Sequence, residues 1–233
     1  MNKTTVHLVL VLAILALASI PAVLYVQLSG GIDNIILHMQ PAPDPKSPEL
    51  VAKKNAAATA IHQSFAEINN AASLKSYSTA NQNVCNKGQN NSKVRDGYAH
   101  RCITTTTVFY GFSGDFRQQM ITLEQKLRAL GWQPKGDTLQ QIMIEYYDKY
   151  YGKKNPVSNS LGGKYLVSDL PTPLGGYSKD TQLLDIRYAE AETQNIDYLN
   201  VLYQANVDDI LKTIAKQNKY MIILSIQKVY FQN

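Results

Sequence analysis

An uninterrupted apolar run near the N-terminus constrains this chain more than any other feature. Residues 6–28 (VHLVLVLAILALASIPAVLYVQL) contain no Asp, Glu, Lys or Arg. An α-helix rises about 1.5 Å per residue, so ~20 apolar residues cross the ~30 Å hydrocarbon layer of a bilayer. The run is therefore long enough to span a membrane, and it predicts a single transmembrane helix. A buried helix of a water-soluble domain would normally show a polar stripe, which this run lacks.

The charges that flank this run predict its orientation. Lys3 and the terminal amino group precede it, whereas Asp33 and Asp44 follow it. Under the positive-inside rule, residues 1–5 form a short cytoplasmic tail and residues 30–233 lie outside the membrane. The lipid bilayer is thus the first expected partner, through residues 6–28. The expected location is a single-pass membrane protein with the bulk of its chain extracytoplasmic.

A cleaved signal peptide is the alternative interpretation of the same run. Its apolar core would be Leu8–Leu15, followed by a small-residue cleavage site at Ala16–Ala18. Apolar residues continue beyond that site as far as Val26, which favours an uncleaved anchor. The sequence does not decide whether cleavage occurs, but both interpretations export the rest of the chain.

Two cysteines, Cys85 and Cys102, flank a loop rich in Gly, Asn and Lys. In an oxidising compartment they would form one disulfide, which stabilises a fold by roughly 3 kcal/mol for a loop of this size. A metal site would need further ligands at short spacing, and only His100 lies nearby. A cysteine nucleophile with His100 as its base is weaker still, because near neighbours on a strand do not converge on one atom. The pair therefore predicts a disulfide.

The segment after the apolar run predicts a tether and then a helix. Four prolines within residues 29–48 favour a stiff, extended tether, because each proline disfavours the α conformation of its predecessor. Within residues 49–101 the sequence predicts an alanine-rich helical stalk, with Pro48 at its first position, and then the loop clipped by the disulfide. Alanines bury little surface, so we expect helix 49–76 to take a protein partner.

Residues 102–233 predict an α+β domain. Its expected elements are strands at 102–112, 139–151, 181–191 and 220–231, with helices at 116–130 and from 207 onward. Asp115 and Asn206 are the expected N-caps, and Gly131 is the expected left-handed residue after the first helix. Residues 197–204 fit either a strand or a helix. This β-α-β-β-α-β order predicts a ferredoxin-like domain, an antiparallel sheet with both helices on one face.

A long connection at residues 152–180 carries two Gly-Gly pairs and three prolines and is the expected functional loop. Before it and at its start, aromatic and basic residues interleave. They form a candidate rim for a ligand or partner, composed of Tyr146, Tyr147, Tyr150, Tyr151, Lys153 and Lys154. Only five of the 23 basic residues are Arg, the side chain that usually reads phosphates and base edges, so we expect no specific nucleic-acid partner.

The sequence contains no phosphate-binding loop, dinucleotide fingerprint, nucleophile elbow or zinc-protease motif. It predicts no catalytic residue, no metal site and no cofactor. Glu190 and Glu192 are the nearest approach to an acid pair, and the sequence does not place them beside a cleft. Whether the chain is an enzyme therefore stays undecided, with a non-enzymatic role favoured.

Three functions compete on these grounds. The favoured one is a membrane-anchored, extracytoplasmic interaction or envelope-assembly module. The others are a cell-surface sensor or small-ligand domain that uses loop 152–180, and an envelope hydrolase built from dispersed carboxylates. In its order of elements, the chain resembles the bitopic subunits of bacterial type IV pilus and type II secretion platforms. That resemblance implies a ferredoxin-like domain behind a helical stalk; it assigns no residue. The sequence names neither partner, ligand, oligomeric state nor type of organism.

Overall fold

A computed structural model describes residues 24, 27, 30–72, 74–90, 93–144, 156–158, 164–166, 172–190, 200 and 202–233. The chain divides into two compact units, and each is described on its own. The first unit comprises residues 1–50, 85–102 and 231–233; the second comprises residues 51–84 and 103–230. Among the described residues, no helix combines the length and apolar character that a bilayer span requires. The predicted span at residues 6–28 lies outside them, apart from Leu24 and Gln27.

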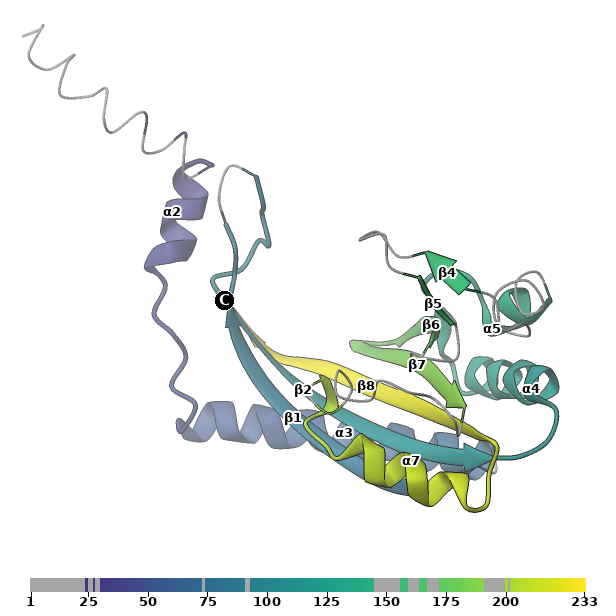
Figure 1. The fold of residues 1–233 in the computed structure, drawn as a ribbon. Helices are drawn as coiled ribbons and strands as arrows, with labels where there is room; N and C mark the ends of the chain where they lie inside the picture. The colour runs from purple at the N-terminus through teal and green to yellow at the C-terminus, as the bar shows by residue number, and fades with distance from the viewer. Residues whose placement is uncertain are drawn as a thin grey trace, which may run out of the picture. The chain divides into compact units, whose positions relative to one another are not determined.

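A six-stranded antiparallel sheet organises the fold (Figure 1). Its spatial order is β1 (Lys75–Lys87), β2 (His100–Phe112), β8 (Tyr220–Gln232), β7 (Gln182–Glu190), β6 (Thr172–Lys179) and β3 (Gln133–Pro134). A separate two-stranded sheet pairs β4 (Pro156–Ser158) with β5 (Lys164–Leu166). The sequence prediction of an α+β fold is confirmed.

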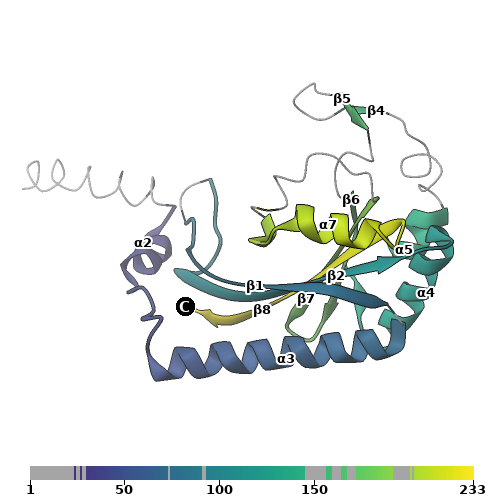
Figure 2. The same ribbon diagram turned by 60° about the horizontal axis from the view of Figure 1, so that its bottom comes forward.

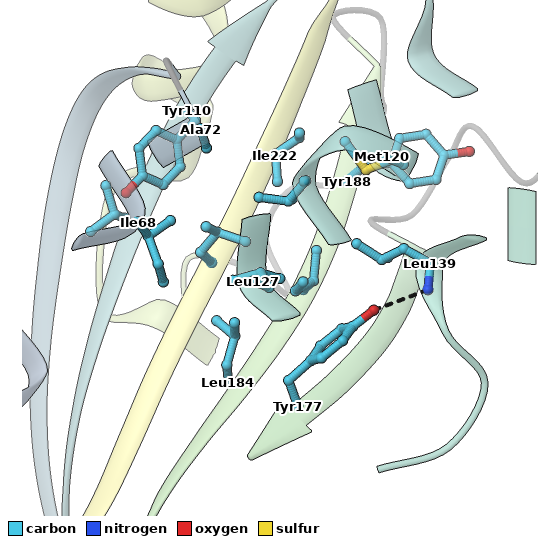
Figure 3. Packing of buried hydrophobic residues seen from close by; sticks show 14 of the residues in the cluster. Ile68, Ala72, Tyr110, Met120, Leu127, Leu139, Tyr177, Leu184, Tyr188 and Ile222 are labelled. Atoms are coloured by element: carbon cyan, nitrogen blue, oxygen red, sulfur yellow. Dashed lines mark hydrogen bonds between the residues drawn. The ribbon is translucent and has the colours of Figure 1, made fainter. Parts of the chain in front are cut away.

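One face of the sheet is covered by two helices, α3 (Pro48–Ala72) and α4 (Phe116–Ala129). In the second unit, Ile61, Phe65 and Ile68 of α3 are at most 4% exposed. They share a core with even-numbered residues of β2 and β8 and with the inward side of α4. Figure 3 shows part of this core, with Ile68 and Tyr110 at one end and Tyr177 at the other.

The opposite face carries α7 (Val207–Ala215), so the sheet lies between α3 and α7 (Figure 2). Successive side chains of a strand point to opposite faces, and Phe109, Met221 and Ile223 accordingly pack under α7. The side chain of Asn206 caps this helix by accepting a hydrogen bond from the backbone N–H of Asp209 at 3.3 Å. The predicted N-cap of this helix is confirmed.

The clearest local prediction, the helix at 116–130, is also confirmed. The Asp115 side chain accepts a hydrogen bond from the N–H of Gln118, which caps α4 at its N-terminus. At the other end, Gly131 has a φ of 89° and donates to the carbonyl of Arg128, while the N–H of Trp132 donates to that of Leu127. These two bonds are the Schellman motif that the glycine predicted.

The ferredoxin-like arrangement is not what the second unit adopts. A ferredoxin-like sheet requires each helix to connect two parallel strands and both helices to lie on one face. Here β7 and β8, the strands on either side of α7 in the chain, pair directly and antiparallel. In addition, α4 and α7 lie on opposite faces of the sheet. The prediction correctly identified most of the elements but not their pairing.

Three local predictions also need correction. The expected strand at 139–151 begins instead with the short helix α5 (Leu139–Gln141), and residues 142–144 continue it as a wider π-type turn. The expected tether at 29–48 contains a helix, α2 (Ile32–Met39), before its extended part. The expected helical stalk is not free, because the apolar stripe of α3 packs on the sheet.

Two strands of the main sheet were expected as loop. The predicted loop that follows α3 contains β1, and the C-terminal part of the predicted loop 152–180 forms β6. Of the described positions in the ambiguous segment 197–204, residues 200, 202 and 203 are helical and Gln204 lies in a turn. The strands expected at 181–191 and 220–231 are confirmed as β7 and β8.

Candidate functional site

The predicted disulfide is confirmed. It joins Cys85 of β1 to Cys102 of β2, whose Cα atoms are 4.0 Å apart. Beyond it the hairpin closes through the N–H of Gly88, which donates to the carbonyl of Ala99 at 2.8 Å. Because both cysteines of the chain are in this bond, neither is a thiolate ligand or nucleophile. The disulfide serves as a structural clip at the base of the hairpin tip.

The predicted rim lies outside the described residues. This applies to all six of its members: Tyr146, Tyr147, Tyr150, Tyr151, Lys153 and Lys154. It also applies to Glu192, so the suggested pairing with Glu190 at the end of β7 stays a prediction. A pocket under loop 152–180 stays a prediction as well.

A polar recess lies on the α7 face of the sheet, in the second unit. It has a volume of about 320 Å³, and its lining includes strand residues from β1, β2, β7 and β8. Its hydrogen bonds are internal: the Thr107 and Ser225 hydroxyls lie 2.8 Å apart, and Arg187 Nε lies 2.9 Å from Asp185 Oδ2. Among the described residues of the lining, Asp185 is the single carboxylate. These described residues can bind polar groups, but they include no pair of carboxylates for acid–base chemistry.

A buried carboxylate, Glu124, lies beside a second hollow of about 460 Å³. It is 2% exposed, and it accepts hydrogen bonds from Arg128 Nε at 2.7 Å and from the backbone N–H of Gln140 at 2.6 Å. Nearby, the Tyr177 hydroxyl accepts the N–H of Leu139 at 3.0 Å (Figure 3). These bonds hold α5 against α4 and β6, so a structural role accounts for this buried charge.

A third hollow, of about 420 Å³, lies between α3 and the β1–β2 hairpin. It is lined in part by His62, which is exposed, and by Asn69, whose Oδ1 accepts the Tyr110 hydroxyl at 2.6 Å. Burial raises the pKa of Tyr110 above its ordinary value of 10.0. Tyr110 is therefore a neutral donor at physiological pH. Of the lining residues that the structure describes, none besides His62 is charged or a base.

The two edges of the main sheet differ sharply. At one edge lies β3, only two residues long and containing Pro134. At the other lies β1, which is 13 residues long, and none of its residues is buried. Among the described strands, none pairs with the outer side of β1. Unpaired backbone N–H and C=O groups along such an edge are ready to bind another strand.

No group of three His, Cys, Asp or Glu residues capable of holding a metal ion occurs in the described part of the chain. The chain matches no known family model, no curated protein and no solved structure. The arguments for function therefore rest on the chain's own residues.

The edge strand was missed because its sequence has little apolar alternation. Residues 75–87 read KSYSTANQNVCNK, which is polar and rich in Asn and Ser. The sequence feature that could have predicted this strand was the turn-forming stretch between the two cysteines. A cross-linked pair on either side of such a stretch is typical of a hairpin, and Cys102 already belonged to a predicted strand.

Proposed function

We propose that this chain is a membrane-anchored, extracytoplasmic interaction module that binds a partner protein along the outer edge of β1. The observation that carries the proposal is the contrast between the long, exposed β1 edge and the short edge at β3. Natural sheets usually protect an edge with proline, a central lysine, a bulge or a short strand. The β3 edge is protected because its strand is short and contains Pro134. Residues 76–86 of β1, by contrast, contain neither a proline nor a charged residue.

Charge favours a partner other than a second copy. The only charged residues of β1 are at its two ends, Lys75 and Lys87. Two β1 strands paired antiparallel about their centres would place each Lys75 opposite a Lys87, and like charges directly opposite destabilise a strand pair. The occupant we propose is an extended segment of another protein, neutral and polar in its middle and acidic near its ends. Backbone hydrogen bonds would supply affinity, as in other strand additions.

The anchoring part of the proposal rests on residues 6–28 and on the disulfide. A charge-free run of this length is typical of a membrane span. The Cys85–Cys102 bond favours an oxidising compartment, because cytosolic thiols are kept reduced. Together they support an N-terminus in the cytoplasm and a folded part on the far side of the membrane. The helix expected at 49–76 is α3 in the structure, and its exposed side is a second surface available to the same partner.

A register test distinguishes strand addition from loose contact. Thr79, Asn81 and Asn83 are all exposed and, at i, i+2 and i+4 of β1, share one face. A photo-crosslinking side chain is placed at each in turn, in the full chain in its own membranes. Crosslinked peptides are then mapped by mass spectrometry. We expect each two-residue step along β1 to move the crosslink by two residues along one partner segment.

The matched control carries the same side chain at Gln118, which is exposed on α4. It should give no crosslink to that segment. A product between two copies of this chain, crosslinks without the two-residue step, or equal capture from Gln118 would each rule out the proposed edge. A central charge, Asn83→Glu, should reduce capture from Asn81, because a carboxylate at mid-strand is one of the devices that block edge pairing.

A small-ligand domain is the second candidate, favoured by the hydroxyl and amide groups that line the polar recess on the α7 face. Such groups suit neutral sugars. Titration of the full chain with neutral monosaccharides, followed by NMR of the Thr107 and Ser225 amides, tests this. Chemical-shift changes on adding sugar that disappear in the Thr107→Val variant would support sugar binding at this recess. Spectra that do not change on adding sugar would rule it out.

A further inference from the structure

Helix α2 exposes an apolar stripe. Ile32 is 64% exposed, Ile36 50% and Met39 79%. Their spacing of four and three residues places all three on one side of the helix. Three large apolar side chains aligned on one face of an eight-residue helix suggest a surface that is covered in the working protein.

The start of this helix is tied to the end of the apolar run. The N–H of Gly30 donates to the carbonyl of Gln27 at 3.1 Å. The side-chain amide of Asn34 donates to the carbonyl of Gly30 at 3.3 Å, which links the first turn of α2 to Gly30. In the sequence, α2 begins only four residues after the run ends at Leu28, and a chain extends by at most about 3.6 Å per residue, so α2 begins close to the end of the run.

The hairpin tip between β1 and β2 belongs to the same unit and meets α2 at the same point. The guanidinium of Arg95 donates to the carbonyl of Gly30. Figures 1 and 2 both show this tip beside α2. Lys93, Val94 and Arg95 are all exposed there, Val94 by 41%. The Arg95 side chain therefore lies next to the first turn of α2, and the exposed Lys93 and Val94 directly precede it in the sequence.

We infer that the Ile32–Ile36–Met39 stripe and this hairpin tip lie in the outer headgroup layer of the bilayer that residues 6–28 span. The inference rests on the proposed span. The polar layer on each side of the hydrocarbon is roughly 5–8 Å deep, so a helix that begins one turn beyond the span starts within or beside it. Apolar side chains of interfacial helices enter the boundary between headgroups and acyl chains, and basic side chains meet the phosphates.

A protein partner explains the stripe less well, because chain continuity already brings α2 to the lipid surface. An eight-residue helix alone would bind a bilayer weakly. Tethering by the span makes its binding intramolecular, so weak contact suffices. The span then holds the chain in the membrane, while α2 and the hairpin tip set the height of this unit above it.

Depth-dependent quenching tests the inference. Both native cysteines are in the disulfide, so one introduced cysteine can be labelled selectively with a fluorophore. Met39→Cys is labelled in the full chain and reconstituted into vesicles of phosphatidylcholine and phosphatidylglycerol. We expect the label to be quenched by lipids spin-labelled near the headgroup and to be shielded from aqueous iodide. Gln118→Cys, on α4, is the control and should show the reverse.

Flotation of the vesicles separates this inference from the proposed function. Protein that floats, but with the Met39→Cys label as open to iodide as the Gln118→Cys label, would overturn the inference and leave the span intact. Protein that does not float would overturn both. Shielding from iodide without quenching by spin-labelled lipid would mean that protein covers the stripe, and would also overturn the inference.

The hairpin tip is tested with Val94→Cys. Because Lys93 and Arg95 flank this position, we expect stronger quenching by spin-labelled lipid in vesicles with phosphatidylglycerol than in phosphatidylcholine alone. Lys93→Gln in the same labelled chain should reduce that difference. Equal quenching in both lipids would remove the hairpin tip from the membrane contact.

Discussion

The hydroxyl of Tyr177 on β6 accepts the backbone N–H of Leu139, the first residue of α5, at 3.0 Å. Tyr177 and Leu139 are each fully buried. This bond fixes the segment after α4 to strand β6, next to the Glu124 carboxylate that accepts the N–H of Gln140. A buried N–H that loses its acceptor keeps its full desolvation penalty, so the bond makes a testable contribution to stability.

Tyr177→Phe should therefore lower the free energy of unfolding by about 1–3 kcal/mol, because it leaves the Leu139 N–H buried without an acceptor. Urea unfolding followed by the fluorescence of Trp132, the only tryptophan, measures the change. Tyr98→Phe, on the half-buried ring beside Arg101, is the matched control and should change little. Equal effects of the two variants would contradict the assigned role of the bond.

Two buried tyrosines predict a loss of stability at alkaline pH. Burial raises the pKa of both Tyr110 and Tyr177 above their ordinary value of 10.0. The unfolded chain loses these protons as the pH rises past about 10, while the folded chain keeps them. The associated stability is complete below pH 10 and declines above it. Unfolding free energies measured from pH 8 to 11 should show this decline.

Tyr110→Phe and Tyr177→Phe should each flatten that alkaline decline, because phenylalanine has no proton to lose. A decline as steep in the Tyr110→Phe, Tyr177→Phe double variant as in the native chain would show that other groups cause it.

Removing the disulfide should destabilise the fold by roughly 3 kcal/mol, because the bond closes a loop with a sequence separation of 17 residues. The Cys85→Ser, Cys102→Ser double variant is compared with the native chain by urea unfolding. Reductant should lower the stability of the native chain toward that of the double variant and should not affect the variant. Equal stability of the oxidised and reduced native chain would contradict the prediction.

Gly88 is required where the hairpin closes. A Cβ at this position would lie 2.0 Å from the carbonyl oxygen of Tyr98, which belongs to the backbone and cannot move aside cheaply. Gly88→Ala should cost about 1–3 kcal/mol, in the range of other overpacked sites. Gly136→Ala is the control, because a Cβ there meets nothing within 4 Å. Thermal unfolding compares the two, and equal midpoints would refute the clash.

The elements that the sequence predicted well are those whose signals are local. In α4, the Asp115 cap, the apolar stripe and Gly131 all lie within one helix and agree with one another. The prediction for the next segment was wrong because the alternation of Ile142, Ile144 and Tyr146 with their neighbours in the sequence was given more weight than a competing local signal. Thr138 and Gln141 form a capping box, which predicts a helix start.

Strand pairing was beyond the sequence because it depends on residues far apart in the chain. Nothing near Gln182 in the sequence indicates that it lies opposite Lys228. The sequence also does not indicate that β7 pairs directly and antiparallel with β8 and not with a parallel strand. The edge position of β1 likewise follows only from the assembled sheet. No sequence motif could therefore predict the outer edge of β1 as a candidate interface. The disulfide near the end of this strand, by contrast, was predictable from two cysteines and a turn-forming loop.

The unequal lengths of β1 and β3 limit what strand addition can build. A sheet open at both edges can accept neighbours on either side and grow into a fibre, whereas a sheet with one edge formed by a two-residue strand that contains a proline offers a single site. Each molecule could then recruit one strand and no more, so assembly would stop at a defined complex of fixed stoichiometry.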